Sequence, residues 1–141
     1  MQKTLNRFLL AQDNTFQTAL TEIRSRKKRS HWMWYIFPQI TGLGSSQTAE
    51  FYGIKDYKEA KAYLDHPVLG ERLREISFEL LKLQNIDALQ IFGYPDNLKL
   101  KSCMTLFSAV AASDDSVFSQ VLVKYFEGER DIRTLNLINL S

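Results

Sequence analysis

One aromatic segment of the chain carries side chains that could form the wall of a ligand pocket. Residues 30–37 read Ser-His-Trp-Met-Trp-Tyr-Ile-Phe. Trp and Tyr rings can stack on the ring of a ligand, while their N–H and O–H groups orient it. His31 is the best acid–base candidate, because the ordinary pKa of histidine, about 6.5, lies near neutrality. The segment therefore predicts ligand binding by Trp32, Trp34 and Tyr35, with His31 as the catalytic group if the protein is an enzyme.

A purely structural explanation of this segment stays open. A buried helix whose Trp and Tyr tips bond to backbone groups gives the same pattern, and a strand of this length cannot be told apart by periodicity. We expect a short buried helix that ends before Pro38. On such a helix Lys28, His31 and Tyr35 would share one side, because they are spaced by three and four residues.

Positive charge is concentrated just before the aromatic segment. The net charge is +2, yet residues 1–34 hold seven Lys or Arg against two Asp or Glu, and five of the seven lie in residues 24–29. Arg29 could hold a phosphate or carboxylate with its two-pronged guanidinium group. The alternative is a cationic helix end, which the helix dipole favours. Because the rest of the chain is net acidic, nucleic-acid binding is disfavoured.

A glycine-rich loop follows the aromatic segment. Gly42 and Gly44 precede an expected helix start, where free backbone N–H groups can hold an anion. The loop lacks the preceding strand and the Lys-Ser/Thr ending of a P-loop. A plain turn with Ser46 as the helix cap is the simpler explanation.

A second polar cluster is expected on a later helix. Lys101, Thr105 and Ser108 fall on one flank, where an ammonium and two hydroxyls could bind an anion. A boundary between core and solvent would give the same pattern. The single cysteine, Cys103, and the two histidines have no metal-ligand spacing, so neither a metal nor another cofactor is expected.

The apolar spacing is helical nearly throughout. We predict an all-α, multihelical single domain over residues 1–141, with about seven to nine helices, several of them short. Asp114 and Asp115 are expected just before one helix, where its dipole favours negative charge. The clearest core stripe has steps of four and three, at Leu69, Leu73, Ile76, Leu80 and Leu83. Side-chain caps are expected at Asn14, Ser46, Asp56 and Asp131.

Composition also predicts a compartment. A single cysteine fits a reducing environment. The first residues lack a signal-peptide pattern, and no apolar stretch approaches the roughly 20 residues that span a bilayer. We therefore expect a cytoplasmic protein without a membrane partner.

The longest motif of the chain resembles a known family. Residues 29–39, followed by Gly42-Leu43-Gly44, resemble the bacterial family catalogued as domain of unknown function 1810. The resemblance continues through residues 51–54, 66–70, 91–93 and 98–107. It implies a compact multihelical fold and no established activity, ligand or partner. The motif coincides with the positions flagged above and adds Gln39: Arg29, His31, Trp32, Trp34, Gln39, Gly42, Gly44, Lys101 and Thr105.

Two functions remain as hypotheses from the sequence. The first is a binding site, enzymatic or not, for a small anionic ligand with a ring, such as a nucleotide. The second is a protein-interaction or homodimerising domain without catalysis, which would use an exposed apolar patch. A cavity lined by the flagged residues would support the first.

Overall fold

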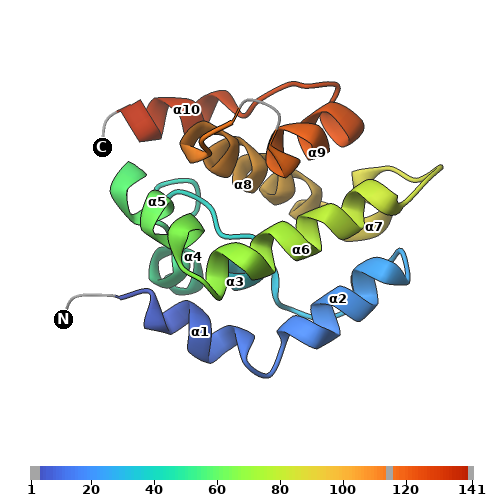
Figure 1. The fold of residues 1–141 in the computed structure, drawn as a ribbon, viewed down its shortest axis with the longest axis horizontal. Helices are drawn as coiled ribbons and strands as arrows, with labels where there is room; N and C mark the ends of the chain where they lie inside the picture. The colour runs from blue at the N-terminus through green and yellow to red at the C-terminus, as the bar shows by residue number, and fades with distance from the viewer. Residues whose placement is uncertain (1–3, 114–115, 140–141) are drawn as a thin grey trace.

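The computed structural model describes residues 4–113 and 116–139, which contain ten α-helices and no strand (Figure 1). An isolated parallel bridge joins Ile40 to Ile54. The all-α prediction is confirmed, and the helices are more numerous than expected because three of them have only four to six residues. In chain order they are α1 Asn6–Gln12, α2 Phe16–Arg24, α3 Met33–Ile36, α4 Gln47–Tyr52, α5 Tyr57–Asp65, α6 Leu69–Lys82, α7 Ala88–Phe92, α8 Asp96–Val110, α9 Val117–Phe126 and α10 Ile132–Asn139.

Helix α8 is the centre of the fold. Every residue from Ser102 to Ser108 is buried, so this helix is covered on all sides rather than along one stripe. Helices α5, α7, α9 and α10 pack against it. Helix α6 runs across the middle of the molecule, with α1 and α2 on one side and α8 to α10 on the other (Figure 1). The first turns of α8 are its least buried part, and they reach the surface beside the loop that follows α3.

The core is rich in contacts between aromatic rings. Phe8 contacts Tyr63 at a centroid distance of 5.1 Å and an angle of 89°, and Tyr63 lies 5.3 Å from Phe107. These three side chains are fully buried. Four of the five residues predicted for the core stripe lie on α6 and are buried: Leu69, Leu73, Ile76 and Leu80. The fifth, Leu83, follows the end of the helix and is only partly buried.

Helix caps follow the local sequence in three of the four predicted cases. Ser46 Oγ accepts a hydrogen bond from the Ala49 N–H, and Asp56 and Asp131 cap α5 and α10 in the same way. The cap predicted at Asn14 is wrong, because α2 begins after Thr15 and has no side-chain cap. The predicted placement of residues 114 and 115 before α9 lies outside the described residues.

The helix expected around residues 30–37 is shorter than the pattern suggests. Helix α3 spans only Met33–Ile36, so Lys28 and His31 precede it. The prediction that Lys28, His31 and Tyr35 share one side of a helix is therefore wrong. The cause is Glu22 of α2. Its carboxylate accepts hydrogen bonds from the backbone N–H groups of residues 29 and 30 and so holds this part of the chain outside the helix.

Candidate functional site

A cavity of about 520 Å³ lies where the segment from α3 to Gly44 meets the first turns of α8 and the start of α10. Four of the residues predicted from the sequence line this cavity, although they come from separate stretches of the chain. Its lining residues are Trp34, Gln39, Leu43, Gly44, Tyr94, Pro95, Leu98, Lys99, Lys101, Ser102, Asp131 and Arg133. The cavity is large enough for a small organic molecule.

Three cations and one carboxylate line the cavity. The Lys99 ammonium lies 4.0 Å from the centroid of the Trp34 ring, which is cation–π geometry. Lys101 forms an ion pair with Glu129, whose side chain is 73% exposed. The carboxylate, Asp131, already accepts hydrogen bonds from the Ser102 hydroxyl and from Thr134. The lining residues therefore carry three positive charges against one negative charge, which favours an anion.

Gln39 contributes a buried donor with nothing to bind. The residue is 7% exposed, and among the described residues its Nε2 atom has no hydrogen-bond partner. Leaving such a group unpaired costs about 1–3 kcal/mol. Asn97 Oδ1 is also buried without a partner in the described part of the chain, but Asn97 does not line the cavity. Gln39 lines the cavity, so this unpaired donor belongs to the cavity wall.

Glu22 holds the aromatic segment in place next to the cavity. Its carboxylate accepts hydrogen bonds from the backbone N–H of Arg29 and Ser30, the Ser30 hydroxyl and the indole N–H of Trp32, at 2.5–3.0 Å. Burial alone would raise the pKa of Glu22, but these donors outweigh it and lower the pKa from its ordinary 4.5 to about 2. An ionised Glu22 therefore fixes the chain immediately before α3, which carries Trp34.

A partly buried ion-pair network lies behind Lys99, one of the three cations of the cavity wall. Asp96 Oδ1 is 3.1 Å from the Lys99 ammonium, and Asp96 Oδ2 is 2.9 Å from Lys28. The Lys28 side chain is only 9% exposed and also donates to the Ser30 carbonyl at 2.6 Å. Burial would raise the pKa of Asp96, yet the hydrogen bonds from both lysines lower it below its ordinary value. Asp96 is therefore a carboxylate shared by two lysines.

Six of the ten predicted site residues are not in the cavity lining, and four of them belong to residues 29–35. The side chains of Arg29 and His31 are exposed. Trp32 is fully buried, and its indole N–H is bound to Glu22. The Tyr35 ring packs against Tyr52 at 5.2 Å. The structure thus separates His31, the catalytic candidate, from the cavity that contains Trp34.

Gly42 and Thr105 act next to the lining rather than within it. Gly42 has φ +102°, and a Cβ there would lie 3.3 Å from Leu137 of α10. Thr105 is fully buried, and its Oγ1 accepts the backbone N–H of Asp131 at 2.9 Å. Gly44 does line the cavity, where a Cβ would lie 2.9 Å from that of Ala49 and 3.4 Å from the Trp34 ring. The two glycines and Thr105 therefore bring the loop, α8 and α10 together.

Sequence reasoning missed most of the polar lining, namely Tyr94, Lys99, Ser102, Asp131 and Arg133. Lys99 carried one available signal, since Asp96 precedes it by three residues on the same helix and the two are ion-paired. Asp131 was expected only as a helix cap. Arg133, Ser102 and Tyr94 gave no signal, because their place in the wall depends on how α10 and the turn before α8 pack against the loop.

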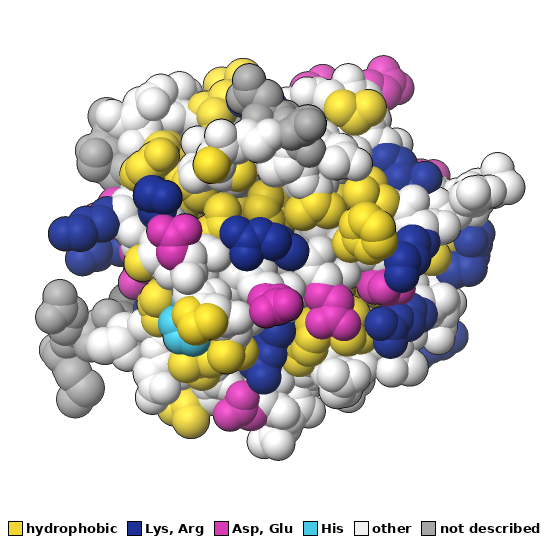
Figure 2. Space-filling view, in the orientation of Figure 1, with side chains coloured by type: hydrophobic (Ala, Val, Ile, Leu, Met, Phe, Trp, Pro, Cys, Tyr) yellow, Lys and Arg dark blue, Asp and Glu magenta, His cyan; other side chains and the backbone are white. Residues whose placement is uncertain are grey.

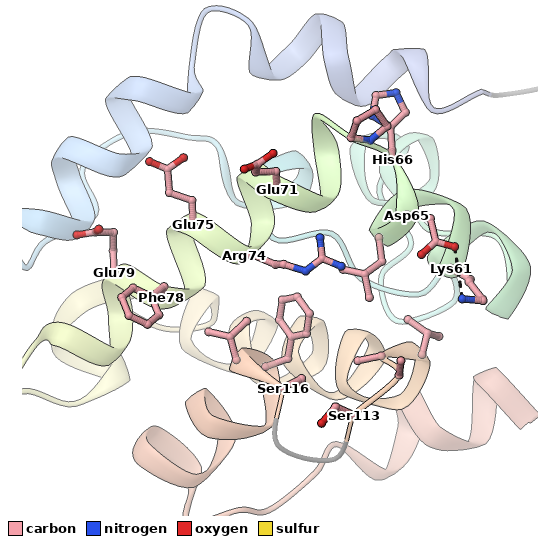
Figure 3. A pocket seen from close by; sticks show the side chains of 17 residues that line it. Lys61, Asp65, His66, Glu71, Arg74, Glu75, Phe78, Glu79, Ser113 and Ser116 are labelled. Atoms are coloured by element: carbon pink, nitrogen blue, oxygen red, sulfur yellow. Dashed lines mark hydrogen bonds and ion pairs between the residues drawn. The ribbon is translucent and has the colours of Figure 1, made fainter.

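A second hollow is larger but has a different character. It measures about 1010 Å³ and lies between α5, α6 and the chain leading into α9 (Figure 3). Figure 2 shows this face, with a band of hydrophobic side chains between α6 and α9 and acidic side chains below it. Several of its charged groups are already paired: Lys61 with Asp65, and Glu79 with both Arg24 and Lys82. Among the described residues, none of its lining side chains has a buried polar atom without a partner, so the smaller cavity is the better candidate site.

Other site types find no support in the described part of the chain. No three His, Cys, Asp or Glu residues there are grouped closely enough to hold a metal ion. Among the described residues, no helix combines the length and apolar character that crossing a membrane requires.

Comparisons with known proteins agree on the family. The model of the family described as "Protein of unknown function (DUF1810)" matches residues 2–138. The crystal structure of the conserved hypothetical protein Rv1873 from Mycobacterium tuberculosis, at 1.38 Å, is similar with a TM-score of 0.93 and 43% identity, over 97% of each chain. A search of curated proteins found no match. The chain therefore belongs to the DUF1810 family.

Proposed function

We propose that the cavity between the α3–Gly44 segment, α8 and α10 binds a small anionic molecule that carries a ring, such as a nucleotide or an aromatic acid. The observation that carries the proposal is the buried Gln39 amide without a partner among the described residues, in a cavity that also contains an aromatic wall and three cations. A protein tolerates an unpaired buried donor at a stability cost, and ligand binding is a common reason for one.

Each group of lining residues would have its own role in binding such a ligand. Lys99, Lys101 and Arg133 supply positive charge for a carboxylate, sulfonate or phosphate. Gln39 donates to an acceptor on the ligand. Tyr94, which is 75% exposed, and Leu98, which is 47% exposed, form an apolar rim that could cover a ring. Binding a ring there would remove apolar surface of Tyr94 and Leu98 from water, which favours binding.

Ligand binding can be tested with purified protein by thermal shift and calorimetry. The panel comprises nucleoside monophosphates, phosphosugars and aromatic carboxylates, each with an uncharged counterpart. A ligand at 100 times its dissociation constant stabilises the fold by about 2.7 kcal/mol, which raises the melting temperature by several degrees. The proposal expects larger shifts for anions with a ring than for their uncharged counterparts, which bind more weakly.

Two variants show whether a hit binds in this cavity. Lys99→Met removes a cation from the wall, and Lys58→Met removes an exposed lysine on α5, outside the cavity lining. We expect Lys99→Met to weaken binding about tenfold and Lys58→Met to leave it unchanged. Equal affinities for both variants, or no shift with any anion of the panel, would refute the proposed function.

A further inference from the structure

Lys28 does not line the cavity, yet its charge affects the net charge beside the cavity wall through Asp96. Its ammonium is 2.9 Å from Asp96 Oδ2, and the other oxygen of Asp96 is 3.1 Å from Lys99. Two lysines therefore share one carboxylate, and the three groups together carry one net positive charge. Without Lys28, the Asp96–Lys99 pair would be neutral.

We propose that Lys28 is a positioning residue for Lys99. By offsetting the charge of Asp96, it leaves the Lys99 ammonium, which lies over the Trp34 ring, with positive charge for the anionic group of a ligand. Asp96 holds the Lys99 ammonium over that ring, and Lys28 cancels the charge of the carboxylate from behind. The inference rests on the proposed function and refines it, because it places the anionic group of the ligand at Lys99.

The other cations of the wall fit this assignment less well. Lys101 is matched one to one by Glu129, so that pair adds no net charge. The side chain of Arg133 is exposed, where water and salt screen its charge. Lys99 has a side chain only 21% exposed and lies against an aromatic face, so an anion beside it would be partly removed from water.

Structural stability alone does not account for a lysine at position 28. Its side chain is 9% exposed and lies against the Trp32 ring, with the ammonium 5.1 Å from the ring centroid. Replacing a buried ion pair as a whole by apolar residues of similar volume often leaves a protein equally stable, so stability does not by itself require charges here. Lys99 already balances the charge of Asp96, and Lys28 adds the second positive charge of the cluster.

The test uses pairs of ligands and pairs of variants. The probes are adenosine monophosphate and indole-3-acetate, with adenosine and indole-3-acetamide as uncharged counterparts, measured by calorimetry at low ionic strength. Lys28→Met should weaken the binding of the anions about tenfold and leave the uncharged counterparts unaffected, because it removes one partly buried positive charge. Lys28→Arg should bind nearly as well as the wild type.

The double variant separates charge from structure. Lys28→Met with Asp96→Asn restores the single net positive charge, and the side-chain carbonyl oxygen of the introduced amide can still accept a hydrogen bond from Lys99. We expect it to regain most of the affinity that Lys28→Met loses. If Lys28→Met alone does not fold, the double variant decides: near wild-type affinity supports the inference, and a loss of about tenfold overturns it.

Two further outcomes would overturn the inference for different reasons. Equal loss for anions and uncharged counterparts would show that Lys28 is only structural. Wild-type protein that binds neither anion would refute the proposed function itself, and the inference with it.

Discussion

Replacing Glu22 by glutamine should remove most of the acid sensitivity that this side chain gives the fold. The folded-state pKa of Glu22 is lowered from 4.5 to about 2, although burial alone would raise it, because four hydrogen bonds favour the carboxylate. A lowered pKa stabilises the folded state fully above the ordinary value of 4.5, and the stabilisation is lost as the pH falls toward about 2. The shift corresponds to about 3 kcal/mol at neutral pH.

The measurement is the free energy of unfolding in urea at several pH values. The wild type should exceed Glu22→Gln by about 3 kcal/mol at about pH 7, since the amide presents two N–H groups where the carboxylate accepted hydrogen bonds. The difference should shrink by about 2 kcal/mol between about pH 7 and about pH 3, because the unfolded wild-type chain takes up a proton there that the folded chain does not.

The control is Glu71→Gln, which alters a carboxylate on α6 whose residue is exposed, and it should change the stability little at any pH. A difference between wild type and Glu22→Gln that stays constant over the same pH range would contradict the reasoning. The loss would then come from packing or geometry rather than from the ionised state of Glu22.

Three further predictions follow from burial and close contact. Gln39→Leu should leave the free energy of unfolding unchanged or raise it, because the Gln39 Nε2 atom has no partner among the described residues. Gln12→Leu should lower it by about 2 kcal/mol, because Gln12 Nε2 donates to both the Tyr35 carbonyl and the Tyr63 hydroxyl. Urea unfolding of both variants measures the difference. Gly70→Ala should lower the melting temperature by several degrees, since its Cβ would lie 1.9 Å from a backbone oxygen. Cys103 should resist iodoacetamide until the protein is unfolded in urea, because burial raises the pKa of its thiol; mass spectrometry measures the label.

Features set by neighbours in the chain were predictable. The stripe on α6 follows from the helical period, and the caps at Ser46 and Asp56 depend on an oxygen and an N–H three residues apart. The prediction that Lys28, His31 and Tyr35 share one side of a helix was wrong because a distant residue, Glu22, binds the backbone of this segment. Glu22 lies on another helix, and nothing in residues 28–35 indicates that a carboxylate will accept hydrogen bonds from their backbone N–H groups.

The cavity was predictable only in part, for the same physical reason. Trp34 and Gln39 lie in one motif, and Lys101 was flagged for its charge. Their meeting with Arg133 depends on the rotation of α10 against α8, which packing decides and periodicity does not. The Asp96–Lys99 pair was a local signal, but the role of Lys28 in it follows from a contact between distant parts of the sequence.

The motif at residues 29–39 divides into two parts with different tasks. In the first part, backbone groups of residues 29 and 30 and the Trp32 indole bind one ionised carboxylate, so these residues anchor the chain to α2. In the second part, Trp34 and Gln39 line the cavity. Anchoring explains why side chains such as Arg29 and His31 can be exposed within a motif that is otherwise largely buried. It also links the acid stability of the fold to the proposed ligand site, because loss of the Glu22 charge would weaken the anchoring of the segment that positions Trp34.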